Sequence, residues 1–318
     1  MLILELAIET IDLTKKYDSL IAVDKLNLKV QRNSIHGFLG PNGAGKSTTI
    51  KILVGLLKAT EGTAKVLGKK VYADDADARL NIGYMPELPK FPKHLKGSEL
   101  LDIYGRMFGM TQLELKEQIP KLIDLVGLKG RENDLIGKYS KGMQQRIGIA
   151  QALLNNPELV ILDEPSMGLD PVGMVEVREL VKAISKEGMT VFLSSHLLYE
   201  VEQICTHVTI INRGKALVSD TLENVSKMIS GPATMQVEIV NLDDRMITAL
   251  KKLAEVKETS KNGNFLNIAL TTREDVRAKI SQTITKKGGI IVGMSQKSHS
   301  LEDVFIQLIN KPQGDQPQ

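Results

Sequence analysis

Cysteine and aromatic residues are scarce in this chain. It has one cysteine, Cys205, no tryptophan, and only 4% of its 318 residues are aromatic. A single cysteine excludes an internal disulfide and is typical of a cytoplasmic protein. The low aromatic content argues against a nucleic-acid surface built on base stacking. No group of histidine, cysteine and aspartate has the spacing of a zinc site.

Long hydrophobic runs and strong charge of one sign are also missing. No apolar run reaches the roughly 18 to 20 residues of a membrane span, and the first residues lack the basic region of a signal peptide. The net charge is +3, from 41 basic and 38 acidic residues, without a basic block. We therefore expect a cytoplasmic protein that binds no nucleic acid and reaches a membrane only through a partner.

The segment from Gly40 to Ser47 matches the phosphate-binding P-loop pattern, in which glycine and four further residues precede Gly-Lys-Ser. An apolar run, Ile35–Leu39, precedes it and a helical pattern follows from Thr48, which disfavours a chance glycine-rich turn. The glycines let the backbone fold around a phosphate chain, Lys46 reaches the β- and γ-phosphates, and Ser47 ligates Mg²⁺. The nucleotide contacts predicted here are Gly40, Pro41, Asn42, Gly43, Ala44, Gly45, Lys46, Ser47 and Thr48.

Two adjacent carboxylates follow a second apolar strand. Leu159–Leu162 is continuously apolar, as expected for a parallel strand buried on both faces, and Asp163 and Glu164 come directly after it. Ligands of open α/β sheets bind at the carboxyl ends of the strands. Beside a P-loop, Asp163 is placed to hold Mg²⁺ indirectly and Glu164 to orient the attacking water. Without the P-loop, a solvated turn would be an equal interpretation.

A second helix N-terminus and one histidine complete the candidates. Ser140 is a good N-cap and Gly142 permits close approach, so this helix start could receive an anion, although by itself it indicates only a capped helix. His196 follows the apolar run Val191–Leu193 and could contact the γ-phosphate. We interpret the other four histidines as structural or surface residues: His36, His94, His207 and His299.

The pattern of runs and breaks predicts two domains. Residues 1–230 read as a P-loop α/β core with a helical insertion at about 88–156, and a boundary falls near Gly231-Pro232. Residues 231–310 follow a βαββαβ order, which predicts a small ferredoxin-like α+β domain, and a final helix is expected over Leu301–Ile309. The polar tail, residues 311–318, is expected to be disordered.

Together these segments resemble the nucleotide-binding subunit of an ATP-binding-cassette (ABC) transporter. Six segments agree with that family in order and spacing over residues 6 to about 220: the P-loop, the signature Tyr139–Met143, the extended Walker B pair Asp163-Glu164, the D-loop Ser166–Asp170, the H-switch Ser194–His196 and the A-loop residue Tyr17. The Q-loop position carries Glu87 where glutamine is usual. The segment Leu301–Phe305 resembles the accessory domain of exporter-type members.

The resemblance implies an α/β fold: a RecA-like core, an antiparallel β subdomain and a helical insertion, followed by the C-terminal domain. It implies catalysis by Glu164, His196 and Lys46, adenine stacking on Tyr17, and Mg²⁺ bound by Ser47, Asp163 and Glu87. It also implies a homodimer, or a heterodimer with a similar subunit, that sandwiches two ATP molecules. A separate multi-span permease would hold the dimer at the inner face of the cell membrane, with export the expected direction.

Other classes of ABC protein fit the chain less well. Ribosome-remodelling members carry two cassettes in one chain, whereas this chain has one. DNA-repair members separate the motifs with a long coiled coil, and no sustained heptads lie between Lys46 and Ser140. A non-catalytic regulator is disfavoured because Lys46 and Glu164 are both present. The alternative to a transporter subunit is therefore a soluble ABC ATPase that remodels a ribosome or DNA complex.

Overall fold

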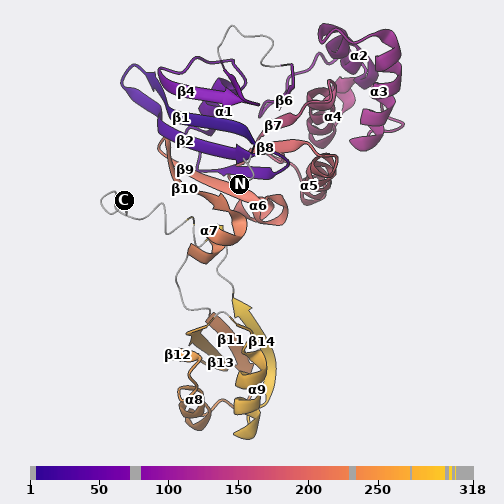
Figure 1. Cartoon of the computed structure of the whole chain (residues 1–318). Helices are drawn as coiled ribbons and strands as arrows, with labels where there is room; N and C mark the ends of the chain where they lie inside the picture. The colour runs from indigo at the N-terminus through magenta and orange to yellow at the C-terminus, as the bar shows by residue number, and fades with distance from the viewer. Residues whose placement is uncertain are drawn as a thin grey trace. The chain divides into compact units, whose positions relative to one another are not determined.

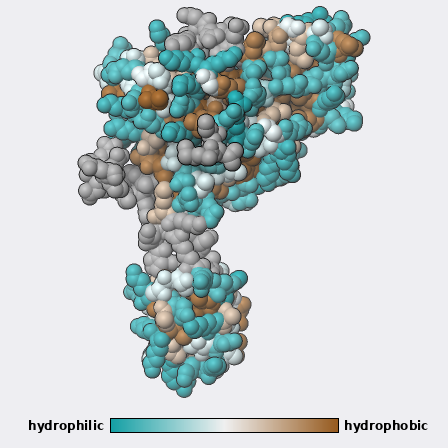
Figure 2. Space-filling view, viewed as in Figure 1, coloured by the Kyte–Doolittle hydropathy of each residue, from teal (hydrophilic) through white to brown (hydrophobic). Residues whose placement is uncertain are grey.

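The computed structural model describes residues 5–71, 80–228, 234–272, 274–297, 301–302 and 305. The chain divides into two compact units, Met1–Val225 and Ser226–Gln318 (Figure 1). Hydrophilic residues dominate the visible face of each unit, with hydrophobic side chains scattered between them (Figure 2). Each unit has its own hydrophobic core.

An antiparallel sheet forms one layer of the N-terminal unit. Its strand order is β2-β1-β4-β5. The bounds are β1 Leu6–Tyr17, β2 Leu20–Gln31, β4 Glu61–Val66 and β5 Lys69–Lys70. Apolar residues recur along β1 and β2 and are buried, whereas the residues between them are mostly polar, which gives the sheet one core face. This layer confirms the predicted antiparallel β subdomain.

The second layer is a six-stranded sheet with the order β10-β9-β3-β8-β7-β6. Its strands are β3 Ile35–Leu39, β6 Ile82–Met85, β7 Leu159–Asp163, β8 Thr190–Ser195, β9 His207–Asn212 and β10 Lys215–Thr221. Neighbouring strands from β9 to β6 run parallel, and β10 pairs antiparallel with β9. Every residue of β3, β7 and β8 is buried, as their apolar runs predict. The parallel order brings the carboxyl ends of these three strands to one edge.

Helices α1 Lys46–Leu53, α5 Pro171–Lys186, α6 Leu198–Ile204 and α7 Leu222–Met228 accompany the central sheet (Figure 1). The main core joins α1 to strands of both sheets. Its largest aromatic members, Phe38 of β3 and Phe192 of β8, have ring centroids 5.4 Å apart. Because β3 and α1 both contribute to this core, the loop between them is held at both of its ends.

The predicted helical insertion is present as three α-helices and one 3₁₀ turn. They are α2 Gly97–Met107, α3 Gln112–Leu125, η2 Ile136–Lys138 and α4 Lys141–Leu153. Thr111 and Glu114 form a reciprocal capping box at the start of α3. Ser140 caps α4, because its side chain accepts a hydrogen bond from the Met143 N–H at 3.2 Å.

The C-terminal unit is a four-stranded antiparallel sheet packed against two helices. Its elements are β11 Thr234–Ile239, α8 Asp244–Leu250, β12 Val256–Asn262, β13 Phe265–Leu270, α9 Arg277–Lys286 and β14 Ile291–Lys297. The order β12-β13-β11-β14 is that of a ferredoxin-like fold and confirms the prediction. One core contains the inward residues of the strands together with Met246 of α8 and Ile280 of α9. Most of the predicted helix Leu301–Ile309 and the whole tail, residues 311–318, lie outside the described residues.

A buried histidine lies in the central sheet. His36 of β3 is 1% exposed, and its Nε2 lies 2.8 Å from Thr209 Oγ1. Its ring lies 6.2 Å from that of His207. Burial, with the nearby His207 adding to it, lowers the pKa of His36 from 6.5 to about 3. His36 is therefore neutral in the folded protein at any ordinary pH.

We expect His36 to make folding sensitive to mild acid. Between the unfolded pKa of 6.5 and the folded pKa of about 3, the unfolded chain binds a proton that the folded chain does not. Stability is thus fully present above the unfolded pKa and falls with pH by up to about 1.4 kcal/mol per unit. As the pH is lowered, the denaturant midpoint should fall less steeply in His36→Gln than in wild type. Parallel curves of midpoint against pH, from about pH 6.5 to 4.5, would contradict this.

Candidate functional site

A cavity of about 630 Å³ opens where the P-loop, the end of β7 and the start of β2 meet. Its walls come from segments far apart in the sequence. The lining residues are Tyr17, Leu20, Ile21, Ala22, Pro41, Asn42, Gly43, Ala44, Gly45, Lys46, Ser47, Thr48, Glu87, Glu164, Met167 and His196. The structure therefore brings together most of the residues that the sequence singled out. Gly40, Asp163, Ser140 and Gly142 do not line it.

Two glycines of the loop have no room for a side chain. Gly45 has φ 105°, and a Cβ there would lie 2.4 Å from the Ala22 carbonyl oxygen. A Cβ on Gly40 would lie 2.5 Å from the Ile211 carbonyl oxygen. One side of the loop therefore packs closely against the backbone of neighbouring strands, and its other side faces the cavity. Such a loop at the start of α1 fits a phosphate chain, because backbone N–H groups and the helix dipole both favour an anion there.

Lys46 is the buried cation of the site. Its side chain is 6% exposed, and Nζ donates a hydrogen bond to the Gly40 carbonyl at 2.7 Å. The same Nζ lies 3.2 Å from Glu164 Oε1, whose side chain is 7% exposed. Buried charges are stable only when paired, and each of these two groups has the other as its counter-ion.

Glu164 sits on a strained turn at the end of β7. Its φ is 51°, a left-handed conformation that costs a non-glycine residue energy, and such outliers concentrate at functional sites. Its carbonyl accepts a hydrogen bond from the Met167 N–H at 3.0 Å. His196 Nδ1 lies 2.8 Å from Glu164 Oε2, so the imidazole donates to the carboxylate. The two Glu164 oxygens thus face Lys46 and His196.

Asp163 lies directly behind the loop. Its Oδ1 accepts hydrogen bonds from Ser194 Oγ at 2.6 Å and Ser47 Oγ at 3.5 Å. Burial raises the pKa of Asp163, and these two hydrogen bonds oppose that shift. The sequence indicates Ser194 only as part of the H-switch segment Ser194–His196. No local pattern predicts its contact with Asp163, because the contact depends on how β7 and β8 pair.

The far end of the cavity is apolar. Tyr17 is 43% exposed, and the Lys15 ammonium lies 5.1 Å from the centre of its ring. Lys15 Nζ also donates to the Lys58 carbonyl at 2.9 Å. Leu20 and Ile21 are exposed beside Tyr17 and line the same cavity. An aromatic ring with exposed aliphatic neighbours can hold a flat heterocycle by stacking and burial.

Oxygen atoms that could contact a divalent metal lie around Ser47. No group of three or more histidine, cysteine, aspartate or glutamate side chains that could hold a metal occurs in the described part of the chain. The Ser47 hydroxyl and Asp163 carboxylate lie next to each other, and Glu87 lines the cavity. Mg²⁺ usually keeps several waters and takes one or two carboxylates plus phosphate oxygens. These sparse oxygen donors therefore fit a Mg²⁺ that arrives with a nucleotide.

Comparison with known proteins places both units. Residues 23–167 match the ABC transporter family, and residues 227–309 match the C-terminal domain of DrrA1-3-like ATP-binding proteins. The bacitracin transport ATP-binding protein BcrA of Bacillus licheniformis is 36% identical over 303 residues, which cover 95% of this chain and 97% of that protein. The linearmycin resistance ATP-binding protein LnrL of Bacillus subtilis (strain 168) is 31% identical over 303 residues, which cover 94% of this chain and 97% of that protein.

A solved structure described as the ATP-binding subunit of an ABC transporter superimposes with a TM-score of 0.64 at 29% identity, covering 70% of this chain and 92% of that one. A second, the dimeric bacterial ABC transporter cassette MJ0796, has a TM-score of 0.62 at 25% identity and covers 68% and 98%. The fold and the relatives that match nearly the whole chain agree: this chain belongs to the ATP-binding subunits of ABC transporters, which are ATPases.

Proposed function

We propose that this subunit binds Mg²⁺-ATP in the cavity around Lys46 and uses its hydrolysis to power export through a separate multi-span permease. The observation that carries the proposal is the buried pair of Lys46 and Glu164 between the P-loop and the end of β7. The pair places a cation that can bind phosphate beside a carboxylate that can orient water, and both line one cavity. Turnover by Glu164→Gln tests it most directly, because this variant should bind ATP and release no phosphate.

The residues predicted from the sequence each have a proposed part. Lys46 and the N–H groups of the loop hold the β- and γ-phosphates, and Tyr17 stacks on adenine. Glu164 takes the position of the base that orients water, with His196 holding its second oxygen. Ser47, Asp163 and Glu87 would hold Mg²⁺. When bound, that ion neutralises charge on the phosphates.

We infer that Ser140 and Gly142 act on the nucleotide of a second subunit. Both lie outside the cavity of their own chain, at the start of α4, whose N–H groups suit an anion. ATP-binding subunits of this family dimerise and pair with a membrane permease. Since the chain carries one P-loop and one signature, a homodimer, or a heterodimer with a similar subunit, completes two sites.

Export as the direction is supported by the relatives named for bacitracin transport and linearmycin resistance. The same matches, which span nearly the whole chain, do not favour the alternative of a soluble ATPase acting on a ribosome or DNA. In the described residues, no helix is long and apolar enough to cross a membrane. We propose that the permease holds the subunit at the inner face of the cell membrane, and a drug, lipid, peptide or metal-related cargo would fit this function.

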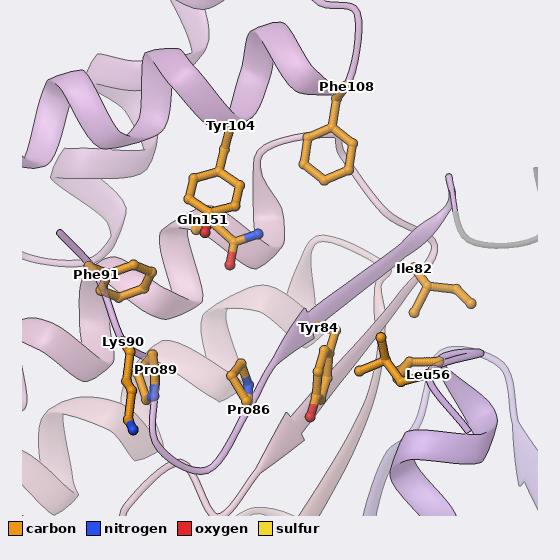
Figure 3. Close-up of a pocket in the computed structure, with 11 residues that line it drawn as sticks. Leu56, Ile82, Tyr84, Pro86, Pro89, Lys90, Phe91, Tyr104, Phe108 and Gln151 are labelled. Atoms are coloured by element: carbon orange, nitrogen blue, oxygen red, sulfur yellow. The ribbon is translucent and has the colours of Figure 1, made fainter. Parts of the chain in front are cut away.

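The groove for the permease is proposed between β6 and α2. A cavity of about 360 Å³ there has mostly apolar walls. Figure 3 shows the rings of Tyr104 and Phe108 projecting from the end of α2 toward the strand that carries Ile82 and Tyr84, with Phe91 at one side. Such a groove fits the apolar face of a partner helix.

Phe91→Asp is expected to weaken membrane attachment. A carboxylate forced against a docked apolar helix costs about 2 kcal/mol or more, which lowers affinity at least about thirtyfold. The membrane-bound fraction of the chain in its native host should fall, while ATP binding by the purified variant reports its folding. Substitution of exposed Leu113, outside the groove, is the matched control. Equal membrane attachment of both variants would contradict the groove.

We propose that residues 1–230 carry all nucleotide chemistry and that residues 231–310 regulate the dimer or stabilise it. Every lining residue of the cavity precedes residue 200, and the C-terminal unit has a core of its own. Removal of residues 232–318 should therefore leave a fragment that folds and binds ATP with a Kd within about threefold of the full chain. A folded fragment without ATP binding would refute this division.

A further inference from the structure

One buried hydroxyl touches both carboxylate residues at the end of β7. Ser194 is 0% exposed, and its Oγ donates to Asp163 Oδ1 at 2.6 Å. The same Oγ accepts a hydrogen bond from the Glu164 N–H at 2.9 Å. A hydroxyl that donates once and accepts once between neighbouring residues fixes both of them.

Strand register creates this contact. In the parallel pair of β7 and β8, Asp163 lies opposite Ser194, and Ser194 in turn lies opposite Phe38 of β3. The bridge therefore crosses between central strands that cannot shift without breaking the sheet. A one-residue slip would turn the Ser194 side chain to the other face.

The bridge acts where the chain leaves the strand. The strand β7 ends at Asp163, and the next residue, Glu164, has the left-handed φ of 51°. Ser194 supplies the acceptor for the N–H of Glu164, and loss of an acceptor is costly for a buried N–H. On the other side, Asp163 Oδ1 receives its short hydrogen bond from Ser194, compared with 3.5 Å from Ser47.

We propose that Ser194 is a positioning residue, whose hydroxyl sets the directions of the Asp163 and Glu164 carboxylates for Mg²⁺ and for water. The proposal rests on the functions proposed above for those two carboxylates. Ser194 itself does not line the cavity. It acts through residues that do, or that lie directly behind the P-loop.

The test compares side chains of equal size in the full-length chain. Threonine and valine at this position have the same bulk and differ only in the hydroxyl, so any crowding is common to both. Ser194→Ala and Ser194→Val should lower kcat about ten- to a hundredfold, and Ser194→Thr should restore most of it. Binding of a non-hydrolysable ATP analogue should weaken about tenfold with Mg²⁺ present and stay unchanged in EDTA.

Thr10 supplies a matched control for the loss of a buried hydroxyl. Its Oγ1 also donates once, to the Leu26 carbonyl at 2.7 Å, and accepts once, from the Leu28 N–H at 2.9 Å. It lies in β1, away from the cavity, and is 2% exposed. Thr10→Ala should lower the melting temperature as Ser194→Ala does, with unchanged kcat and Mg²⁺ dependence.

The outcomes separate this inference from the proposed function. Wild-type kcat and Mg²⁺-dependent binding in Ser194→Ala, or equal kcat in Ser194→Thr and Ser194→Val, would overturn the role of Ser194. If Glu164→Gln, measured alongside, is inactive in that case, the functions of the carboxylates stand. Turnover by Glu164→Gln at the wild-type rate would instead refute the proposed function, whatever Ser194→Ala does to Mg²⁺-dependent binding.

Discussion

Glu164→Gln should stop ATP turnover and leave ATP binding intact. The amide keeps the size of the side chain but cannot take a proton from water, and removal of a positioned base costs about a hundredfold or more in rate. Lys46 and the loop still hold the phosphates. The expected result is an ATP-bound dimer that does not turn over, detected by size-exclusion chromatography with phosphate release measured in parallel.

The control for this prediction is a variant that loses a different carboxylate from the same cavity. Glu87→Gln removes a carboxylate from the same cavity and restores the residue usual for the family, so it should retain turnover. A turnover rate in Glu164→Gln near that of wild type, together with the absence of a dimer, would show that Glu164 does not act on the attacking water.

The second large effect is complementation between two inactive variants. Lys46→Ala removes the phosphate cation, and Ser140→Arg places a bulky side chain at the start of α4. Each homodimer should be inactive, because both of its composite sites carry one defect. In a mixed dimer both defects fall in one site, and the other pairs an intact Lys46 with an intact Ser140. Random pairing at equal amounts makes half of the dimers mixed, so about a quarter of the wild-type activity is expected if sites act independently.

The measurement is phosphate release against mixing ratio, with mixed dimers verified by cross-linking. A maximum between the two pure variants supports contact of Ser140 with the partner's nucleotide. If Ser140 served its own chain, every site would keep a defect and no mixture would recover activity. ATP-induced closure of the mixed dimer should be followed as well, because it reports nucleotide binding even where hydrolysis needs two intact sites.

Local patterns predicted the elements of the site well. The P-loop, the strand before it and the helix after it are encoded in one continuous segment, as are the β7 strand and its two carboxylates. Apolar runs sufficed because the central strands are buried on both faces. The ferredoxin-like order of the C-terminal unit likewise followed from alternating strands and helices.

Contacts between distant segments could not be predicted in this way. The 3.2 Å approach of Lys46 to Glu164 depends on β3 and β7 lying on either side of β8. The bridge made by Ser194 depends on register, which no local pattern reveals. Leu20 and Ile21 enter the cavity because β1 and β2 form a hairpin beside Tyr17, although in the sequence they read as ordinary strand residues.

The ion pair of Lys46 and Glu164 bears on how a nucleotide would bind. The Glu164 carboxylate already pairs with the ammonium that, on the proposed function, a γ-phosphate would contact. We therefore expect the phosphate to compete with that carboxylate, so that the affinity for ATP would reflect the difference between two pairings. If Glu164 orients water as proposed, a phosphate that takes its place beside Lys46 would leave the carboxylate held by His196 alone. Binding of the substrate and release of the proposed base would then be a single event.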